Sequence, residues 1–449
     1  MKLRLSALII LLSTVSLFAQ FNQYPRPDEG VFTGGAGLMW IDGEPHYRLS
    51  LRPEVSFANF GVGLDLNLDF DKEGKLRKEN FNEFSDYLSI IRYIRYGMKN
   101  EPVYIKLGAL DYHTIGHGTI MNRYNNSPSF DTRKIGLAAD IDFGQFGFES
   151  IYGTFGEGGI IALRGYVRPL QFSTSTDLPI LRNIEVGATF ASDFNKYAGV
   201  LGGNYNAVSD EFEITQDNGA LTIIGFDIGF PVIKSSLATL TLYADYNKII
   251  DFGSGTATGI KFDLEGLGLV SLIAKLERRF NNDQYIPSYF NSFYELDRFR
   301  VDKANAPYLF QSKVQQLAVL TDPDNGWFGE LGVRVLNIFD IIGSYQRLDK
   351  TPKSGILHLY SEIAPEDMPF VARAGYDKVR IESEKDIFTL DDRSYFYTEL
   401  GYKPMPYLLI SMVYHWTFAP VRDAKDNVIS YETQKRIEPR ISFIFPFGL

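Results

Sequence analysis

The stretch GVGLDLNLDF, residues 61–70, alternates between apolar and polar side chains. Its apolar positions are Leu64, Leu66, Leu68 and Phe70, and its polar positions are Asp65, Asn67 and Asp69. Successive side chains of a β-strand point to opposite faces, so this stretch predicts a strand with one apolar and one polar face. A tilted strand of about ten residues is also long enough to cross a bilayer.

The same alternation recurs along the chain, at residues 134–143, 260–265, 270–279 and 408–417. Two candidate strands near the start are weaker. Three glycines within residues 34–37 leave one of them with few side chains, and Pro53 interrupts the other. An alternating pattern alone would also fit a soluble β-sandwich, so the connections between the strands have to separate the two folds.

Brief turns alternate with longer polar loops between the candidate strands. The predicted turns are Met98–Pro102, Gly144–Gln145, Ile233–Ser236, Phe339–Asp340 and Lys403–Pro406, and the predicted loops are Lys72–Ser85, Asp193–Ala220 and Asn281–Gly326. This arrangement is typical of barrels that span an outer membrane. We therefore predict an all-β fold, a closed antiparallel transmembrane β-barrel of about 18 strands (range about 16 to 20), with short periplasmic turns and longer extracellular loops.

Composition excludes several other classes of protein. The 449 residues contain no cysteine, which excludes disulfides, thiolate metal sites and cysteine nucleophiles. After residue 20 no stretch reaches the roughly 18 apolar residues of a transmembrane helix, and no linker divides the chain, so residues 20–449 are predicted to form one domain. Without Lys2 and Arg4 the net charge is −12 (43 basic − 55 acidic residues), which disfavours nucleic acid as a partner.

The final residues, RIEPRISFIFPFGL, carry the most specific resemblance. Their alternating apolar positions are Ile441, Phe443, Phe445 and Phe447. This pattern resembles the C-terminal strand of bacterial outer-membrane β-barrels of the porin-like class, although members usually end on Phe or Trp and this chain ends on Gly-Leu. No closer family is identified. The resemblance implies a place in the outer membrane of a diderm bacterium, contact with its lipid, and recognition of the last strand by the barrel-assembly machinery.

A barrel of this width cannot fill its interior with wall side chains, so its polar face should line a lumen. With the apolar face outward, the charged residues predicted to line the pore are Asp65, Asp69, Lys106, Asp140, Asp142, Arg164, Arg168, Glu185, Asp227, Asp245, Lys261, Asp263, Glu265, Lys275, Glu277, Arg279, Glu330, Arg334, Arg373 and Glu399. The alternative is that most of them pair across neighbouring strands and only hold the wall together.

Eight of these lumenal charges are basic and 12 are acidic, a net charge of −4 (8 − 12). Such an excess predicts that an open pore weakly prefers cations. The aspartates at positions 65, 69, 140 and 142 should have the largest influence, because few basic residues lie beside them in the sequence.

The segment Asn281–Gly326 is the candidate constriction, because it is the longest stretch without clear strands. Within it YLFQSKVQQLAVL has apolar residues at helical spacing, and the candidate constricting side chains are Leu309, Phe310, Val314 and Leu317. Such a short amphipathic helix could fold into the lumen. It could equally lie over the barrel rim or pack against other loops.

Two histidines four residues apart, His113 and His117, have a spacing that can bind metal on a helix. Gly116 and Gly118 argue against a helix there, so we predict no metal or other cofactor and interpret the segment as a polar loop at the barrel mouth. No nucleophile motif accompanies the histidines, so we predict that the protein is not an enzyme, with a barrel hydrolase as the weakest alternative.

These observations leave two functions open. The first is an outer-membrane channel or uptake pore that passes small hydrophilic solutes, with a weak preference for cations. The second is a barrel that anchors or assembles a partner protein or a surface structure. They differ in what occupies the lumen. The sequence identifies neither the solute nor the oligomeric state.

Residues 1–19 are predicted to be a signal peptide for export. Lys2 and Arg4 precede an apolar run from Leu5 to Phe18, and Ala19 follows it. The run is too short to span a bilayer, so it is predicted to be removed rather than retained as an anchor.

We expect the mature protein to begin at or near Gln20, because cleavage after Ala19 would follow this pattern. Intact-mass spectrometry of protein extracted from the outer membrane measures the N-terminus directly. A retained Met1 would contradict both the signal peptide and the predicted location.

Overall fold

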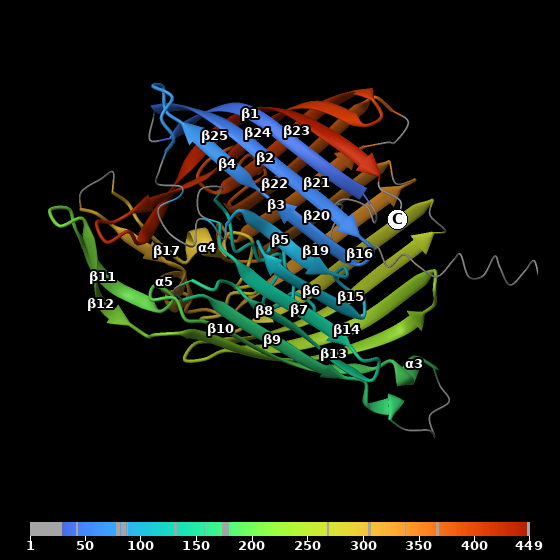
Figure 1. Ribbon diagram of the computed structural model, residues 1–449. Helices are drawn as coiled ribbons and strands as arrows, with labels where there is room; N and C mark the ends of the chain where they lie inside the picture. Colours follow the sequence, from blue (N-terminus) through green and yellow to red (C-terminus); the bar gives the residue numbers. More distant parts are fainter. Residues whose placement is uncertain are drawn as a thin grey trace, which may run out of the picture.

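The computed structural model describes residues 29–41, 44–77, 81, 87, 89–129, 133–156, 158–172, 179–266, 269–303, 307–336, 338–364 and 368–446. The predicted signal peptide and Phe447 lie outside these residues, as does the side chain of Glu265. The described residues form a closed antiparallel β-barrel with loops folded into its interior (Figure 1).

The first half of the wall contains β1 (Glu29–Ile41), β2 (Glu44–Phe57), β3 (Phe60–Leu64), β4 (Leu66–Phe70), β5 (Ile91–Tyr96), β6 (Val103–Gly108), β7 (Gly136–Asp142), β8 (Phe146–Tyr152), β9 (Ile160–Val167) and β10 (Glu185–Asp193). The second half contains β13 (Leu221–Lys234), β14 (Ala238–Ile249), β15 (Ser254–Gly266), β16 (Val270–Asn281), β19 (Asp324–Val335), β20 (Phe339–Leu348), β21 (Gly355–Ile363), β22 (Phe370–Ile381), β23 (Ser394–Met405), β24 (Leu408–Arg422) and β25 (Val428–Pro446).

Each wall strand pairs with its neighbour along the chain, and β25 pairs with β1 to close the sheet, with Pro446 opposite Glu29. The sheet has 21 strand segments, of which β3 and β4 both pair with β2 and together span the wall once. Among the described residues the barrel therefore has 20 strands (21 − 1), at the upper end of the predicted range and above the central value of about 18.

The two weak candidate strands are β1 and β2, and both are full wall strands. The glycines of β1 leave room for an inward side chain, because a Cβ on Gly35 would lie 2.4 Å from Oε1 of Glu438 in β25. Pro53 has no N–H to donate, and the gap between β3 and β4 lies opposite it, between the partner pairs of Leu51 and Glu54. Proline thus interrupts one ladder locally without ending the strand.

The two faces of the wall differ as the alternation predicts. Apolar side chains such as Phe226, Leu331 and Leu400 are exposed on the outside, whereas the residues of opposite parity are polar and mostly buried within the barrel. A closed antiparallel ladder with an apolar exterior satisfies its backbone groups in lipid. Separately, no helix among the described residues is both long and apolar enough to cross a membrane.

The two ends of the barrel differ in their connections. Most short turns lie at the end where β1 begins and β25 stops, here called the turn end, which also carries one longer connection with η3 (Pro169–Gln171) and α3 (Pro179–Arg182). The long connections lie at the loop end, where β11 (Val200–Asn206) and β12 (Glu211–Asp217) form a projecting hairpin (Figure 1). The turn predicted at Phe339–Asp340 is wrong, because both residues belong to β20, where Asp340 pairs with Arg334 of β19 at 2.7 Å.

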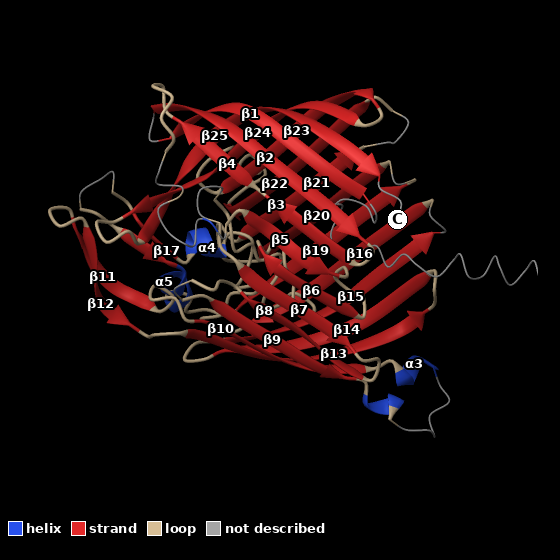
Figure 2. Cartoon of the chain, in the orientation of Figure 1, coloured by secondary structure: helices blue, strands red, loops and turns tan. Residues whose placement is uncertain are grey.

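Two loop-end connections fold into the barrel, as Figure 2 shows by the loops and helices drawn within the ring of strands. The inner loop, residues 109–135, joins β6 to β7. The upper loop, residues 282–323, joins β16 to β19 and contains α4 (Tyr294–Asp297), β17 (Phe299–Val301), β18 (Phe310–Ser312) and α5 (Lys313–Ala318). Their apolar side chains form a buried cluster inside the barrel that includes Met121 and Phe290, both 0% exposed.

Candidate functional site

The inner loop crosses the lumen and contacts the wall on several sides. Its polar contacts are Gly116 N to Glu149 Oε2 of β8 (3.0 Å), Thr119 Oγ1 to Asp245 Oδ2 of β14 (2.8 Å), Arg123 Nη2 to Glu330 Oε2 of β19 (2.6 Å) and Tyr112 Oη to Asp377 Oδ2 of β22 (2.7 Å). Because these strands are spread around the barrel, the loop obstructs the lumen rather than lying along one wall.

Local sequence explains the path of the inner loop. Gly116 and Gly118 have φ of 56° and 82°, a left-handed conformation that glycine adopts without strain. Further along, His113 and Tyr124 exchange backbone hydrogen bonds of 2.8 Å, so the two arms of the loop return side by side. The sequence predicted a polar loop at the barrel mouth, but the loop lies deep inside the lumen. Apolar residues such as Ile120 could have indicated that the loop is buried.

The upper loop lies against the inner loop on the side of the loop end. The backbone of Phe290 joins the inner loop in both directions, since Asn122 N donates to Phe290 O at 2.9 Å and Phe290 N donates to Ile120 O at 3.1 Å. These bonds continue the pairing of the inner loop into the upper one. The two loops therefore form one unit inside the barrel.

The helix predicted within Asn281–Gly326 is present as α5. Ser312 accepts a hydrogen bond from Gln315 N, and the Gln315 side chain accepts one from Ser312 N, which is a capping box. The four candidate constricting residues are separated by the fold. Val314 and Leu317 are buried in the cluster with the inner loop, Phe310 packs against Phe212 of the projecting hairpin, and Leu309 is 66% exposed.

A buried ionic network fastens the upper loop to its surroundings. Arg298 donates to Asp193 at the end of β10 (2.6 Å) and to Glu295 of α4 (2.7 Å). Glu295 also pairs with Lys134 and accepts a hydrogen bond from Tyr124, both of the inner loop. Burial opposes ionisation of Glu295, but Arg298 and Lys134 outweigh it and lower the pKa of Glu295 to about 2. The carboxylate is therefore charged at neutral pH.

A cavity of about 610 Å³ lies between the inner loop and the turn end of the barrel. Asn100 and Asn183, both from turn-end connections, mark its lower side, and Gly116 and His117 of the inner loop mark its upper side. Its basic lining residues are Lys99, Arg123, Arg164, Arg168, Lys234, Lys261, Lys275 and Arg334, and its acidic ones are Glu149, Glu185, Asp263 and Glu330.

Most basic residues of the cavity lining pair with carboxylates that do not line the cavity themselves. Carboxylates outside the lining pair with five of its eight basic residues, namely Asp140 with Lys99, Asp142 with Arg168, Asp227 with Arg164, Glu277 with Lys275 and Asp340 with Arg334. Counting the four acidic lining residues and these five, the local net charge is −1 (8 − 9). The cavity thus presents many donors and acceptors but almost no net charge.

The predicted lumenal residues fall into two groups. Those that line the cavity are Arg164, Arg168, Glu185, Lys261, Asp263, Lys275, Glu330 and Arg334. Those that lie in the inner face of the wall outside it are Asp65, Asp69, Lys106, Asp140, Asp142, Asp227, Asp245, Glu277, Arg279, Arg373 and Glu399. Sequence reasoning missed Lys99, Arg123, Glu149 and Lys234, because two lie in a turn or a loop and two in strands without a clear alternating pattern.

The four aspartates predicted to have the largest influence on selectivity each have a basic partner. Asp69 pairs with Arg48 directly across β2 and β4, and Asp65 contacts both Arg52 and Arg133. Asp140 pairs with Lys99, and Asp142 pairs with Arg168. These partners lie across the sheet or come from loops, so the sequence alone does not reveal them, and the influence of the four aspartates on selectivity stays a prediction.

The histidines of the inner loop do not form the helical pair that their spacing allows. His113 lies in a β-bridge with Tyr124, whereas His117 lies in a turn and stacks on Tyr243 of β14 with ring centroids 4.1 Å apart. Burial lowers the pKa of His117 to about 4, although the charge of Asp227 opposes this shift. Its imidazole is therefore neutral at pH 7, and its Nε2 lies 3.9 Å from Oδ1 of Asp227.

No protein-family model matches this chain, and no curated protein matches its sequence. Solved structures that match include the siderophore receptor PirA of Pseudomonas aeruginosa, with 9% identity and a TM-score of 0.38 over 94% of this chain and 81% of that chain. OccK11 (OpdR) of Pseudomonas aeruginosa has 12% identity and a TM-score of 0.30 over 94% and 97%.

A third match is Wzi of Escherichia coli, described as an outer-membrane protein involved in group 1 capsule assembly and as a carbohydrate-binding β-barrel. It has 12% identity and a TM-score of 0.35 over 94% of this chain and 85% of that chain. The described residues of this chain form a closed β-barrel, as the pairing of its strands shows. Identities this low say nothing about what it binds.

We expect Arg298→Ala to loosen the upper loop, because it leaves Asp193 and Glu295 buried with a lost partner. Removing one member of a buried ion pair costs about 3–5 kcal/mol. Limited proteolysis of the folded barrel should then cleave within residues 299–303, where the wild type resists, while the barrel itself stays intact.

Arg300→Ala is the matched control, since Arg300 lies two residues away and pairs with Asp392 while both side chains remain at least a third exposed. Exposed pairs contribute little, so this variant should resist the protease as the wild type does. Equal resistance of the Arg298 and Arg300 variants would contradict the anchoring role.

Proposed function

We propose that this protein is an outer-membrane channel or uptake pore for small hydrophilic solutes, constricted by its inner loop. The observation that carries the proposal is the cavity of about 610 Å³, which lies in the lumen between the wall and the inner loop and is lined by charged groups. Side chains from many wall strands converge there, as a solute path through the barrel requires. In this orientation the turn end faces the periplasm, and the loop end faces the outside of the cell.

The constriction favours selective passage over general diffusion. An open 20-stranded barrel would leave a wide aqueous lumen, whereas here two loops with an apolar core occupy it. A solute must therefore displace or pass beside the inner loop, and it meets the donors and acceptors of the cavity as it does so. This role needs no catalytic group, and we propose none.

The charge balance supports a weak preference for cations. The cavity with its paired carboxylates sums to −1, whereas the −4 of the twenty residues predicted from the sequence is reduced by basic partners outside that set, such as Arg48 and Arg52. A small excess of negative charge in a narrow region attracts cations, but a Debye length of about 8 Å at physiological ionic strength limits its reach. The preference should therefore be modest.

A second candidate function is the holding of a partner at the cell surface. The observation that favours it is the β11–β12 hairpin, because β12 is exposed along most of its length and carries Glu211, Glu213 and Asp217. An exposed edge strand can pair with another chain. A barrel used only for this purpose needs no solute path, so its lumen should stay blocked by the upper loop when the inner loop is shortened.

We expect removal of Thr114–Arg123, replaced by Gly-Gly, to raise single-channel conductance severalfold in a planar bilayer. His113 and Tyr124 already exchange backbone hydrogen bonds, so the two cut ends lie close enough to be joined without moving the wall. The excision removes the part of the inner loop that reaches the strands opposite.

The matched control replaces Asn206–Glu211 by Gly-Gly at the tip of the projecting hairpin, between the paired residues Tyr205 and Phe212. This change shortens a loop outside the lumen, so conductance should stay at the wild-type value. If the inner-loop variant folds and conducts no better than the wild type, the channel proposal fails.

The reversal potential in a salt gradient measures the charge preference. We expect weak cation selectivity that fades as salt rises, and an increase in that selectivity for Lys234→Gln, which removes a basic residue from the cavity lining. Lys72→Gln serves as control, because Lys72 lies outside the barrel and is 63% exposed. Clear anion selectivity of the wild type would contradict the proposal.

A further inference from the structure

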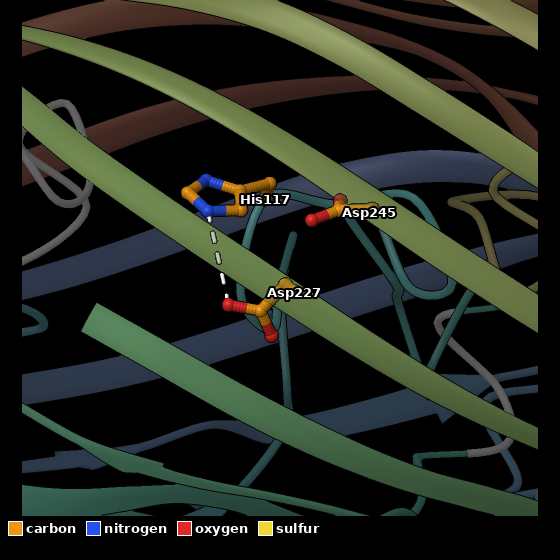
Figure 3. Close-up of side chains that lie close together, drawn as sticks. All are labelled: His117, Asp227 and Asp245. Carbon is orange, nitrogen blue, oxygen red and sulfur yellow. Dashed lines mark ion pairs between the residues drawn. The ribbon is translucent and has the colours of Figure 1, made fainter. Parts of the chain in front are cut away.

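Three side chains with metal-binding atoms converge beside the cavity, as Figure 3 shows. His117 comes from the inner loop, and Asp227 and Asp245 come from β13 and β14, where they lie directly opposite each other. One donor atom of each lies within 4.8 Å of the other two. The cluster joins a loop to the wall, so no alternating sequence pattern could have predicted it.

Two of these donor atoms have no hydrogen-bond partner. Asp245 is only 4% exposed, and its Oδ1 is buried and unpartnered among the described residues. The Nε2 of His117 is likewise buried without a partner in the part of the chain that the structure describes. Leaving a buried polar atom unsatisfied costs about 1–3 kcal/mol, so two in one cluster indicate a missing ligand.

The remaining atoms of the two carboxylates are held in place by neighbours. Thr119 Oγ1 donates to Oδ2 of Asp245 at 2.8 Å, which leaves Oδ1 free, and Arg164 donates to both oxygens of Asp227, at 2.9 and 2.6 Å. Carboxylates that bind metal are commonly oriented by such outer hydrogen bonds. A carboxylate oxygen has two lone pairs, so Asp227 Oδ1 can accept from Arg164 and still coordinate an ion.

The two carboxylates of the cluster face each other, and the charged groups around them are of both signs. Arg164, which pairs with Asp227, and Lys275 are basic, whereas Glu149 and Glu277 are acidic. Like charges directly opposite on neighbouring strands repel each other. A divalent cation between them would neutralise both.

The imidazole is suited to the ion by its position. Its ring stacks on Tyr243, and its Nε2 faces Asp227, 3.9 Å from Oδ1. Zinc bonds of about 2.0–2.2 Å place tetrahedral ligand atoms about 3.5 Å apart, so closure of about 1 Å is needed. His117 and Gly116 border the cavity, which gives an ion an entry path and leaves its remaining coordination positions open.

We propose that His117, Asp227 and Asp245 bind one divalent transition-metal ion, with Zn²⁺ as the expected occupant. One imidazole nitrogen and two carboxylate oxygens suit Zn²⁺ and related first-row ions better than Mg²⁺ or Ca²⁺, which prefer oxygen alone. The ion would tie the inner loop to the wall at the upper side of the cavity, and its open positions would face any solute that carries a carboxylate or another oxygen donor.

Isothermal titration of the metal-stripped, detergent-folded barrel with Zn²⁺ tests this site. We expect one Zn²⁺ per chain in the wild type, and a loss of affinity of about 100-fold or more for His117→Gln and for Asp245→Asn. Both substitutions nearly conserve shape, and faster gel migration of the unboiled protein checks that each variant is folded. His46→Ala removes a partly exposed histidine at the loop end, away from the cluster, and should bind as the wild type does.

Absence of a stoichiometric site in the wild type would overturn the proposal, as would unchanged affinity in either folded variant. X-ray absorption of the zinc-loaded wild type needs no variant, and it should show one imidazole nitrogen among oxygen neighbours. Two or more imidazoles would place the ion elsewhere. None of these measurements involves solute passage, so their failure would leave the channel proposal untouched, and a non-conducting barrel could still bind zinc.

Discussion

Closure of the hydrogen-bonded ladder is the constraint on which the rest of this structure depends. In lipid, an unpaired backbone group costs several kcal/mol, so the sheet must pair its last strand with its first, as β25 does with β1. Closure fixes the face of every side chain at once. With 20 strands it also creates an interior that the wall residues cannot fill, and this space determines how the loops fold.

The inner and upper loops fill part of this interior space with apolar side chains. Met121, Phe290 and Leu317 belong to one buried apolar cluster that also contains wall residues such as Ala138 and Ile223. Thr119, Arg123 and Arg298 contact acidic side chains of the wall. The apolar interior gives cohesion, and the ionic edges fix the orientation. Arg123 pairs with Glu330 and Arg298 pairs with Asp193, so neither of these loop cations is left as an isolated ion in a low dielectric.

The sequence predicts whatever depends on near neighbours along the chain. Alternation located the strands around residues 61–70 and 408–417, and helical spacing located α5, because both patterns repeat within a few residues. It could not predict the site, since Gly116 meets Glu149 and Arg123 meets Glu330 across the lumen. Within the wall, the sequence also does not show which residues lie opposite each other on neighbouring strands. Asp69 looks uncompensated in the sequence, yet Arg48 lies opposite it once β2 and β4 are paired.

Arg164 shows how the wall could sense the position of the inner loop. Its guanidinium contacts Glu149, Glu185 and Asp227 at once. Glu149 in turn accepts the backbone N–H of Gly116, and Asp227 lies beside His117. If the inner loop moves, Glu149 loses the hydrogen bond from the backbone N–H of Gly116. The hydrogen bonds of Arg164 to its three carboxylates must then rearrange. A solute that offers its own donor to Glu149, or its own acceptor to Arg164, would offset that loss. In the proposed channel, solute binding in the cavity and displacement of the inner loop would therefore be coupled through the same few atoms.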